Sequence, residues 1–192
     1  MIKTRKELKE ILNIDKQAYY TYMFPTKKRK LMASFKKEPA WLIMKWQIIS
    51  RKVDYYKYKI DHDANIYEKL RYLYYIRKRN ILSSKLGLEI GTENIKSGLL
   101  IYHYAGGCVV NSGSEIGSNC HMHGNNCIGN AGPHDLRCPI IGDNVMLGVG
   151  AKIIGNVKIA NGIRVAAGAV VIHSFEEENI TIAGVPAKKV SK

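Results

Sequence analysis

CPIIGDNVMLGVGAKIIGNVKIANGIRVAAGAVV, residues 138–171, repeats one pattern every six residues. An aliphatic side chain returns at each sixth position, and a second small or branched side chain follows four residues later. The first series is Ile141, Leu147, Ile153, Ile159, Val165 and Val171, and the second is Val145, Ala151, Val157, Ile163 and Ala169. The same six-residue spacing holds upstream at Val110, Ile116, Met122 and Ile128. A period held over this length indicates a repeat architecture.

This period excludes a helix, because an α-helix turns once about every 3.6 residues and cannot keep a period of six on one face. A coil of three short strands joined by tight turns can keep it. Each hexapeptide then forms one flat side of a triangular prism, with its aliphatic residue inward and small residues at the corners. A β-sandwich of short strands would not hold so strict a spacing. The repeat therefore predicts a parallel β-helix.

The repeat is interrupted once, between Ile128 and Ile141. Residues 130–139 (NAGPHDLRCP) contain Gly, two Pro and a charged pair, which predicts a loop extruded from the coil. Extruded loops often line functional sites. The repeat ends near residues 174–178, and GVPAKKV (184–190) is expected to form an extended tail.

The composition divides the chain into two different parts. Residues 1–85 hold 22 Lys and Arg against 8 Asp and Glu, whereas residues 86–192 hold 8 of each. Both Trp and ten of the twelve Tyr also lie before residue 86. We therefore predict a basic, Tyr-rich helical region over 1–85 and a β-helix with its tail over 86–192, which together make an α+β fold.

The first part has helical periodicity without a repeat. Leu8, Ile11 and Leu12 predict a first helix that continues through residues 15–19, and residues 38–83 have room for one or two more. An apolar side of this later stretch is predicted at Ile66, Leu70, Leu73, Tyr74 and Ile81.

The positive charge of this region has two interpretations. It is either a solvated basic face or a surface that meets anionic lipid or a phosphorylated acceptor. No nucleic-acid recognition motif is present, and we expect no nucleic-acid partner. The chain opens with MIKTRKELKEIL, which has no secretory pattern, and its longest apolar run is broken by Lys45. The four cysteines form no CxxC pair. We therefore expect a cytoplasmic protein with reduced thiols, with the inner face of the membrane left open as a peripheral location.

Three stretches carry a family resemblance, and they follow one another along the chain. They are SGLLIYHYAGGCVVNSGSEIGSNC (97–120), the repeat quoted above and AGVPAKKV (183–190). Together they resemble the serine acetyltransferase branch of the hexapeptide acyltransferases, which includes relatives that acetylate sugars of capsules and lipopolysaccharides. The resemblance implies a left-handed β-helix, a homotrimer, and acetyl-coenzyme A as co-substrate without a metal.

The resemblance also implies roles for particular residues. His103 matches the family's general base, and Glu89 matches the carboxylate that orients it, although the family usually has Asp there and one residue fewer separates the pair here. The family's coenzyme groove runs along the later coils between trimer subunits. The resemblance therefore implies that Gly148, Val149 and Ala167 line the pantetheine and that Lys188 lies near the nucleotide phosphate.

Two departures bear on the acceptor. Serine-specific members carry Asp before the catalytic His, where this chain has Tyr102, which is expected to contact the substrate. They also carry Arg-His-Pro in the extruded loop, where this chain has Arg137-Cys138-Pro139. Arg137 matches and is expected to meet a carboxylate or a sugar acid, while Cys138 is expected to line the acceptor. These differences favour a saccharide hydroxyl over L-serine as the acceptor.

The chemistry of such a transfer needs few groups. An alcohol attacks a thioester at neutral pH only when a base removes its proton, and the ordinary pKa of histidine, about 6.5, suits it to that role. The substrate is then the nucleophile, and no acyl-enzyme is required. His121 and His123 share one strand face, where they either reach substrate, as we expect for His123, or bind a metal, for which no third ligand is apparent. His134 and Asp135 are a second dyad or simply turn residues.

Other functions remain open. The leading hypothesis is acetyl transfer to a saccharide of surface polysaccharide biosynthesis, and the first alternative is serine O-acetyl transfer in cysteine biosynthesis. A β-helix carbonic anhydrase would need three His ligands around zinc. A trimeric scaffold that has lost its activity would keep the fold without needing His103 and Glu89.

Overall fold

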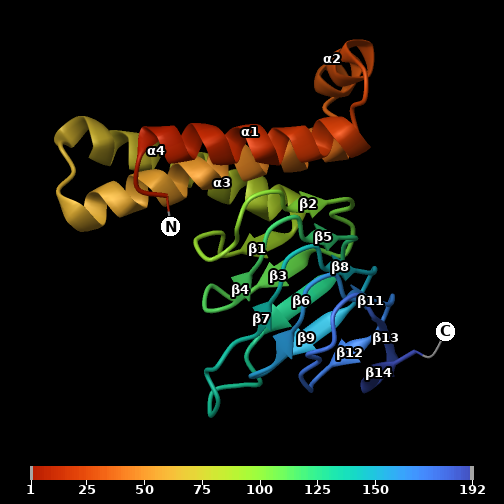
Figure 1. Cartoon of the computed structure of the whole chain (residues 1–192). Helices are drawn as coiled ribbons and strands as arrows, with labels where there is room; N and C mark the ends of the chain where they lie inside the picture. The colour runs from red at the N-terminus through yellow and green to blue at the C-terminus, as the bar shows by residue number, and fades with distance from the viewer. Residues whose placement is uncertain (1, 191–192) are drawn as a thin grey trace. The chain divides into compact units, whose positions relative to one another are not determined.

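The computed structural model describes residues 2–190, and the chain divides into two compact units between Leu86 and Gly87. The first unit is helical and the second consists of short strands, which confirms the predicted α+β class (Figure 1). Within residues 2–190, no helix is long and apolar enough to cross a membrane. Each unit is described separately.

The helical unit starts its helices where the sequence supplies caps. Its elements are α1 (Arg5–Tyr22), α2 (Lys27–Lys36), α3 (Pro39–His62) and α4 (Ile66–Leu86). The Thr4 side chain accepts the backbone N–H of Glu7, whose carboxylate accepts the Thr4 N–H in return. Thr26 caps α2 in the same position, and Pro39 occupies the first turn of α3, where no backbone donor is needed. Helix α1 confirms the helix predicted near Leu8–Leu12.

A hairpin of α3 and α4, with α1 packed along α3, forms the core of this unit. Trp46 is fully buried and its indole N–H donates to the Ser83 hydroxyl at 2.8 Å, which ties α3 to α4. Arg51 and Asp15 form a buried ion pair at 2.9 Å, which ties α3 to α1. Because an unpaired charge in this interior would be costly, the pair fixes the register of the two helices.

The apolar side predicted on α4 does not face this core. Its residues are Ile66, Leu70, Leu73, Tyr74 and Ile81, and all five are exposed. Tyr72 and Tyr75 are the residues of α4 that pack instead, against Tyr55 and Tyr56 of α3. Tyrosine rings bury a large area, so this side of α4 meets its hairpin partner although it lacks the aliphatic series.

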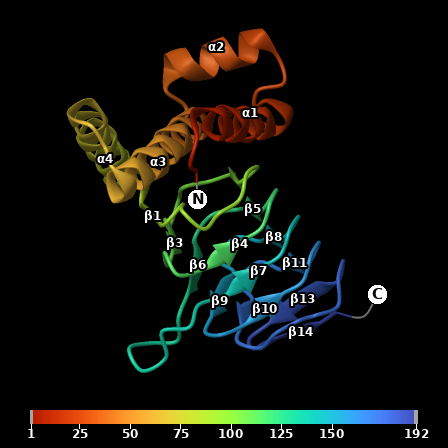
Figure 2. The same cartoon turned by 60° about the vertical axis from the view of Figure 1, so that its left-hand side comes forward.

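The second unit is a parallel β-helix of three sheets (Figure 2). One sheet contains β1 (Leu88–Ile90), β3 (Cys108–Val110), β6 (Asn126–Gly129), β9 (Lys152–Ile154) and β12 (Val170–Val171). A second contains β4 (Glu115–Ile116), β7 (Ile140–Ile141) and β10 (Lys158–Ile159). The third contains β2 (Leu100–Ile101), β5 (His121–Met122), β8 (Met146–Leu147), β11 (Arg164–Val165), β13 (Thr181–Gly184) and β14 (Ala187–Lys189).

The aliphatic series read from the sequence forms the core of the prism. All residues of both six-residue series and the four upstream positions are buried, with at most 3% of the side chain exposed. Each strand pairs with the strand one coil later, so that Ile101, Met122, Leu147 and Val165 stack in one column. The predicted inward positions are therefore confirmed. The tail differs from the prediction only in detail, since β14 folds back and pairs antiparallel with β13.

Two corners of the prism each place one residue per coil in the left-handed backbone region. The corner before the third sheet has Gly98, Asn119, Asn144, Gly162 and Asn179, with φ between 55° and 83°. The corner before the first sheet has Gly87, Gly107, Asn125, Gly150 and Gly168, with φ between 53° and 73°. Glycine and asparagine are the residues that adopt this conformation at least cost.

The left-handed corner at Asn144 (φ 58°) provides a stability test. Replacing Asn144 by Val should destabilise the protein by about 1–2 kcal/mol, because a β-branched residue is strained at positive φ. Asn144→Gly should be close to neutral. Urea unfolding followed by circular dichroism measures both, and Lys158→Val on an exposed strand position is the matched control. A neutral Asn144→Val variant would contradict the assigned corner conformation.

Candidate functional site

His103 lies on the corner that joins the third sheet to the first. It is exposed and follows β2 and Tyr102, whose backbone N–H donates to the carbonyl of Met122 on the next coil at 2.9 Å. This turn continues through Tyr104 to Gly107. It is longer than the turns of the later coils at the same corner. His103 thus stands at the start of the widest turn of this corner.

The strand register aligns the later turns beneath His103. Because Ile101, Met122, Leu147 and Val165 are in register, the positions two residues later are His103, Gly124, Val149 and Ala167. The Gly168 N–H donates to the carbonyl of Val149 at 2.8 Å, and the Gly150 N–H donates to that of Gly124 at 2.9 Å. The predicted base and the predicted coenzyme residues therefore share one edge of the prism.

This edge carries little side-chain bulk below His103. A Cβ at Gly148 would lie 2.5 Å from the backbone nitrogen of Ala167, so no other residue fits there without moving the next coil. Nothing lies within 4 Å of a Cβ built at Gly168. Val149 and Ala167 are exposed. The result is an exposed edge of backbone amides and small side chains, which a long, flexible ligand can approach closely.

Lys188 lies on β14, opposite Ala183 of β13. Ala183 continues the column that runs through Ala166, because Val165 pairs with Ile182. This pairing places Lys188 beside the last coil of the same edge. Its side chain is exposed, and its role toward a phosphate stays a prediction.

Three histidines gather around Tyr102 at the upper end of this edge. The Tyr102 ring stacks on His123, with centroids 4.4 Å apart and planes 16° apart. It meets His121 edge-on at 5.8 Å and lies 6.4 Å from the ring of His103. His121 and His123 are on β5 and just after it, one coil below His103. Tyr102 and His123, predicted to contact substrate, thus lie beside the predicted base.

The environment disfavours extra protons on the two lower histidines. Burial lowers the pKa of His121, and the neighbouring His123 lowers it further. Burial also lowers the pKa of His123, with a second contribution from His103. The Nε2 atom of His123 is buried and has no hydrogen-bond partner within residues 2–190. His121 and His123 are therefore favoured in their neutral form beside the His103 turn.

Glu89, the predicted orienting carboxylate, lies on β1 of the first sheet. It points outward from β1, paired with Val109 of β3, and is exposed. No hydrogen bond or ion pair joins Glu89 to His103 in the described part of the chain. Its orienting role stays a prediction.

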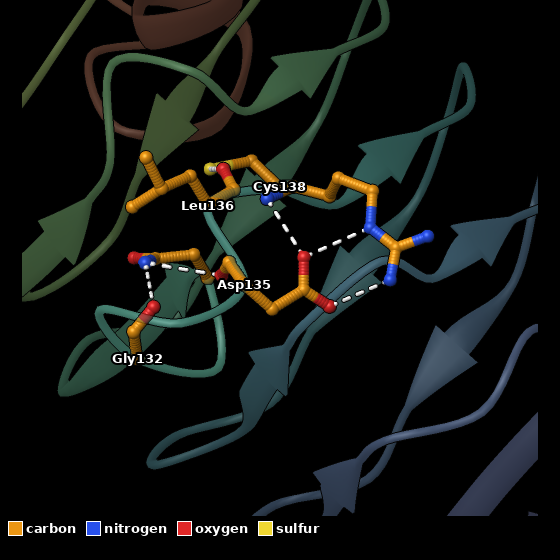
Figure 3. Close-up of polar contacts among 6 residues, drawn as sticks. Gly132, Asp135, Leu136 and Cys138 are labelled. Carbon is orange, nitrogen blue, oxygen red and sulfur yellow. Dashed lines mark hydrogen bonds and ion pairs between the residues drawn. The ribbon is translucent and has the colours of Figure 1, made fainter.

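The extruded loop is held by its own polar groups (Figure 3). The Asp135 carboxylate accepts two bonds from the Arg137 guanidinium, both at 2.8 Å, and a third from the Arg137 backbone N–H at 3.1 Å. This contact lowers the pKa of Asp135. The Asn130 amide bonds the carbonyls of Gly132 and Asp135, which closes the turn that contains His134. Arg137 is thus engaged by a carboxylate of its own loop.

The loop leaves the prism at a different corner from His103. It follows β6 and precedes β7, so it lies between the first and second sheets. A Cβ at Gly113, in the turn above, would lie 3.1 Å from the Cys138 sulfur. Arg137 and Cys138 are therefore not brought to His103 within one chain.

Asn126 is a site-supporting residue that the repeat pattern did not predict. It is 2% exposed and occupies an inward position where the other coils have small or apolar residues. Its amide donates to the carbonyls of Gly148 and Ala151, at 2.8 and 3.3 Å, and its oxygen accepts the Gly124 N–H at 3.0 Å. A Cβ at Gly124 would lie 2.8 Å from the His103 carbonyl, so Asn126 fixes the turn on which His103 rests. The sequence signal that could have identified Asn126 is a polar residue at a repeat position that is small or apolar in the other coils.

The described residues, 2–190, contain no group of three His, Cys, Asp or Glu side chains that could hold a metal ion. His121 and His123 therefore have no third ligand of these types within that range.

No family profile matches the chain. Among curated proteins, a serine acetyltransferase of Buchnera aphidicola subsp. Schizaphis graminum is 34% identical over 142 residues, which are 68% of this chain and 53% of that protein. A serine acetyltransferase of Synechococcus elongatus is 30% identical over 106 residues, 54% of this chain and 43% of that protein. The chain spans about half the length of the curated relatives it matches.

Solved structures resemble both units of the chain. A serine acetyltransferase from Neisseria gonorrhoeae has a TM-score of 0.66 at 24% identity and covers 97% of this chain and 68% of its own. The serine acetyltransferase from Brucella abortus strain S19 in complex with coenzyme A has a TM-score of 0.62 at 25% identity and covers 98% of this chain and 69% of its own. The likeness confirms the predicted plan of N-terminal helices followed by a left-handed β-helix.

Asn126 can be tested as the support of the His103 turn. Replacing Asn126 by Ala should destabilise the protein by about 1–3 kcal/mol, because the buried Gly124 N–H loses its acceptor and the Gly148 carbonyl loses one of its two donors. Urea unfolding measures the free energy, and hydrogen exchange should show faster exchange of the Gly124 amide. Asn125→Gly, on the exposed side of the same turn, should change neither. Unchanged stability of Asn126→Ala would contradict the supporting role.

Proposed function

The chain belongs to the serine acetyltransferase-like branch of the hexapeptide-repeat acyltransferases, and we propose that it transfers acetyl from acetyl-coenzyme A to a hydroxyl group. The observation that carries this proposal is the single edge on which His103 stands above the turns of Gly148–Val149 and Ala167–Gly168. That edge supplies a base and a place for a long thiol ester within one column of turns.

His103 is the proposed general base. Its neutral imidazole takes the proton of the acceptor hydroxyl while the hydroxyl oxygen forms a bond to the acetyl carbon. The bound coenzyme supplies the activated acetyl group as a thioester. The carbon–sulfur bond breaks, and the thiolate receives a proton, so that one hydroxyl hydrogen is exchanged for one acetyl group. Backbone N–H groups of the wide turn from Tyr104 to Gly107 are the proposed donors to the oxyanion.

The residues present fit a coenzyme along this edge. Gly148 leaves no side chain between successive coils, and the open space at Gly168 admits a ligand against the backbone. The exposed Val149 and Ala167 offer apolar contact to a pantetheine chain, and Lys188 offers a charge to a phosphate at the last coil.

A homotrimer is part of the proposal. The loop with Arg137 and Cys138 lies at a different corner from His103, so one chain does not assemble the acceptor residues around its own base. In a threefold arrangement, two different corners of neighbouring prisms meet at each interface. The trimer would thus bring the loop of one subunit toward His103 of the next. The cytoplasmic location expected from the sequence accords with the use of acetyl-coenzyme A.

L-serine is the acceptor that the relatives favour. The named proteins similar to this chain are serine acetyltransferases, and none of those named is a saccharide acetyltransferase. This finding gives less support to the saccharide acceptor that the sequence departures favoured. We therefore place serine O-acetyl transfer first.

A saccharide hydroxyl remains as the second candidate because of two structural observations. Arg137, the residue expected to meet a carboxylate, already forms a two-bond contact with Asp135. Tyr102 replaces the Asp expected before the base and presents an aromatic ring beside His123 instead. An engaged arginine and an aromatic ring suit a neutral sugar better than an amino acid.

The proposal is tested by thiol release from acetyl-coenzyme A with L-serine, hexoses, amino sugars and sugar nucleotides. We expect acceptor-dependent release, and a loss of about 10²–10⁴-fold in kcat for His103→Ala, because general base catalysis contributes that much. His173→Ala, an exposed histidine on another corner, is the matched control.

The acceptor that supports release distinguishes the two candidates. Release with L-serine alone supports the first, and release with sugars alone supports the second. Retention of full activity by His103→Ala, or the absence of release with every acceptor together with no coenzyme binding, would reject the transferase.

A further inference from the structure

The helical unit contains a cavity of its own, with a volume of about 410 Å³, between α1, α3 and α4. Its lining comprises Arg5, Leu8, Lys9, Leu12, Asn13 and Lys16 of α1, Lys52, Tyr55 and Tyr56 of α3, and Tyr67, Arg71 and Tyr75 of α4. The residues from α1 are spaced three and four apart, so one face of that helix forms a complete wall. Nothing proposed above for the β-helix uses this cavity.

The lining is strongly positive. Five of its residues are Lys or Arg, and none is Asp or Glu. No ion pair joins any of these five cations to a carboxylate in the described part of the chain. Of the acids on α1, Asp15 pairs with the buried Arg51 and Glu7 caps the helix start, and the exposed Glu10 is not part of the lining. The lining itself thus offers these cations no carboxylate partner.

Tyrosine rings form the opposite wall. Tyr56 and Tyr75 stack with centroids 5.7 Å apart and planes 18° apart. The Arg71 guanidinium lies 5.4 Å from the Tyr67 ring centroid and 5.5 Å from that of Tyr75, and Lys52 lies 5.0 Å from the Tyr75 centroid. The attraction between a cation and an aromatic face favours these positions of Arg71 and Lys52 at the cavity.

Arg71 has donor capacity left over. A hydrogen bond with Tyr56 raises the pKa of its guanidinium, which keeps the charge in place. Its Nε atom is buried and has no hydrogen-bond partner within residues 2–190. A buried N–H without an acceptor is costly, and Arg71 lines the cavity, where its charged guanidinium can donate to an anionic oxygen of a ligand.

We propose that this cavity binds a small phosphate ester that carries a ring, of the nucleoside diphosphate sugar class. The phosphates would contact Arg71, Lys52 and the cations of α1, and the ring would pack on the tyrosines. The volume is within the range of small-molecule sites, about 300–1,000 Å³, and is too small for a folded partner. A lipid headgroup carries the same phosphate chemistry, so the test separates it from a soluble ester.

The test is calorimetric titration of the full-length protein with UDP-glucose, pyrophosphate and uridine, together with flotation on vesicles that contain phosphatidylglycerol. We expect UDP-glucose to bind at one molecule per chain and more tightly than pyrophosphate, and uridine not to bind. Binding to vesicles without binding of either soluble phosphate would overturn the proposal in favour of a membrane surface. No heat with any phosphate compound would also overturn it.

Matched charge variants locate the site. Lys9→Gln with Lys16→Gln should weaken UDP-glucose binding at least about tenfold, because each charged hydrogen bond contributes that order of affinity. Lys27→Gln with Lys28→Gln removes the same charge from α2 and should leave affinity unchanged. Equal weakening in both would mean diffuse attraction and would reject the cavity as the site.

Two further measurements test whether the cavity itself binds the ligand and whether this ligand is distinct from the coenzyme. Arg71→Lys keeps the charge but loses the planar donor set, and it should also weaken binding while circular dichroism shows the helices intact. Coenzyme A affinity should be the same in wild type and in the Lys9 and Lys16 variant. A parallel loss of coenzyme affinity would show that the cavity serves the coenzyme and would overturn a separate ligand.

Discussion

One backbone constraint governs the β-helix, namely a left-handed residue at each of two corners of every coil. A chain of L-residues enters that region at a cost of about 1–2 kcal/mol unless the residue is glycine or asparagine. Here those two residues occupy all ten corner positions from Gly87 to Asn179. Because each corner turns at the same point of its coil, every strand lies in register with the next, and the aliphatic side chains stack inside.

The same register positions the candidate site. A slip of one residue in any coil would move its inward side chain outward and would separate His103 from the turns beneath it. Asn126 shows how the site depends on this order, since one buried amide joins three turn groups below His103. The site is therefore a consequence of stacked turns and needs no cleft within one chain, whereas the acceptor residues of the extruded loop lie at another corner.

The sequence predicted the features that follow from a local period, and it failed where distant side chains decide. Six-residue spacing identified the inward residues, and the interruption identified the loop. Tyr102 stacking on His123 depends on neighbouring coils, which no spacing along the chain reveals. The pairing of Arg137 with Asp135 depends on the turn geometry of the loop. On α4, Leu70 belongs to an apolar series that suggested a buried side, but Tyr72 and Tyr75 pack against the buried tyrosines of α3 instead.

The central claim, that the corner below His103 receives the coenzyme, is tested most directly by hydrogen exchange with and without coenzyme A. A ligand lying along this edge should slow exchange of exposed backbone amides at Val149 and Ala167, while the extruded loop and the helical unit change much less. Protection confined to the tyrosine-walled cavity of the helical unit, or to a corner without His103, would contradict the account.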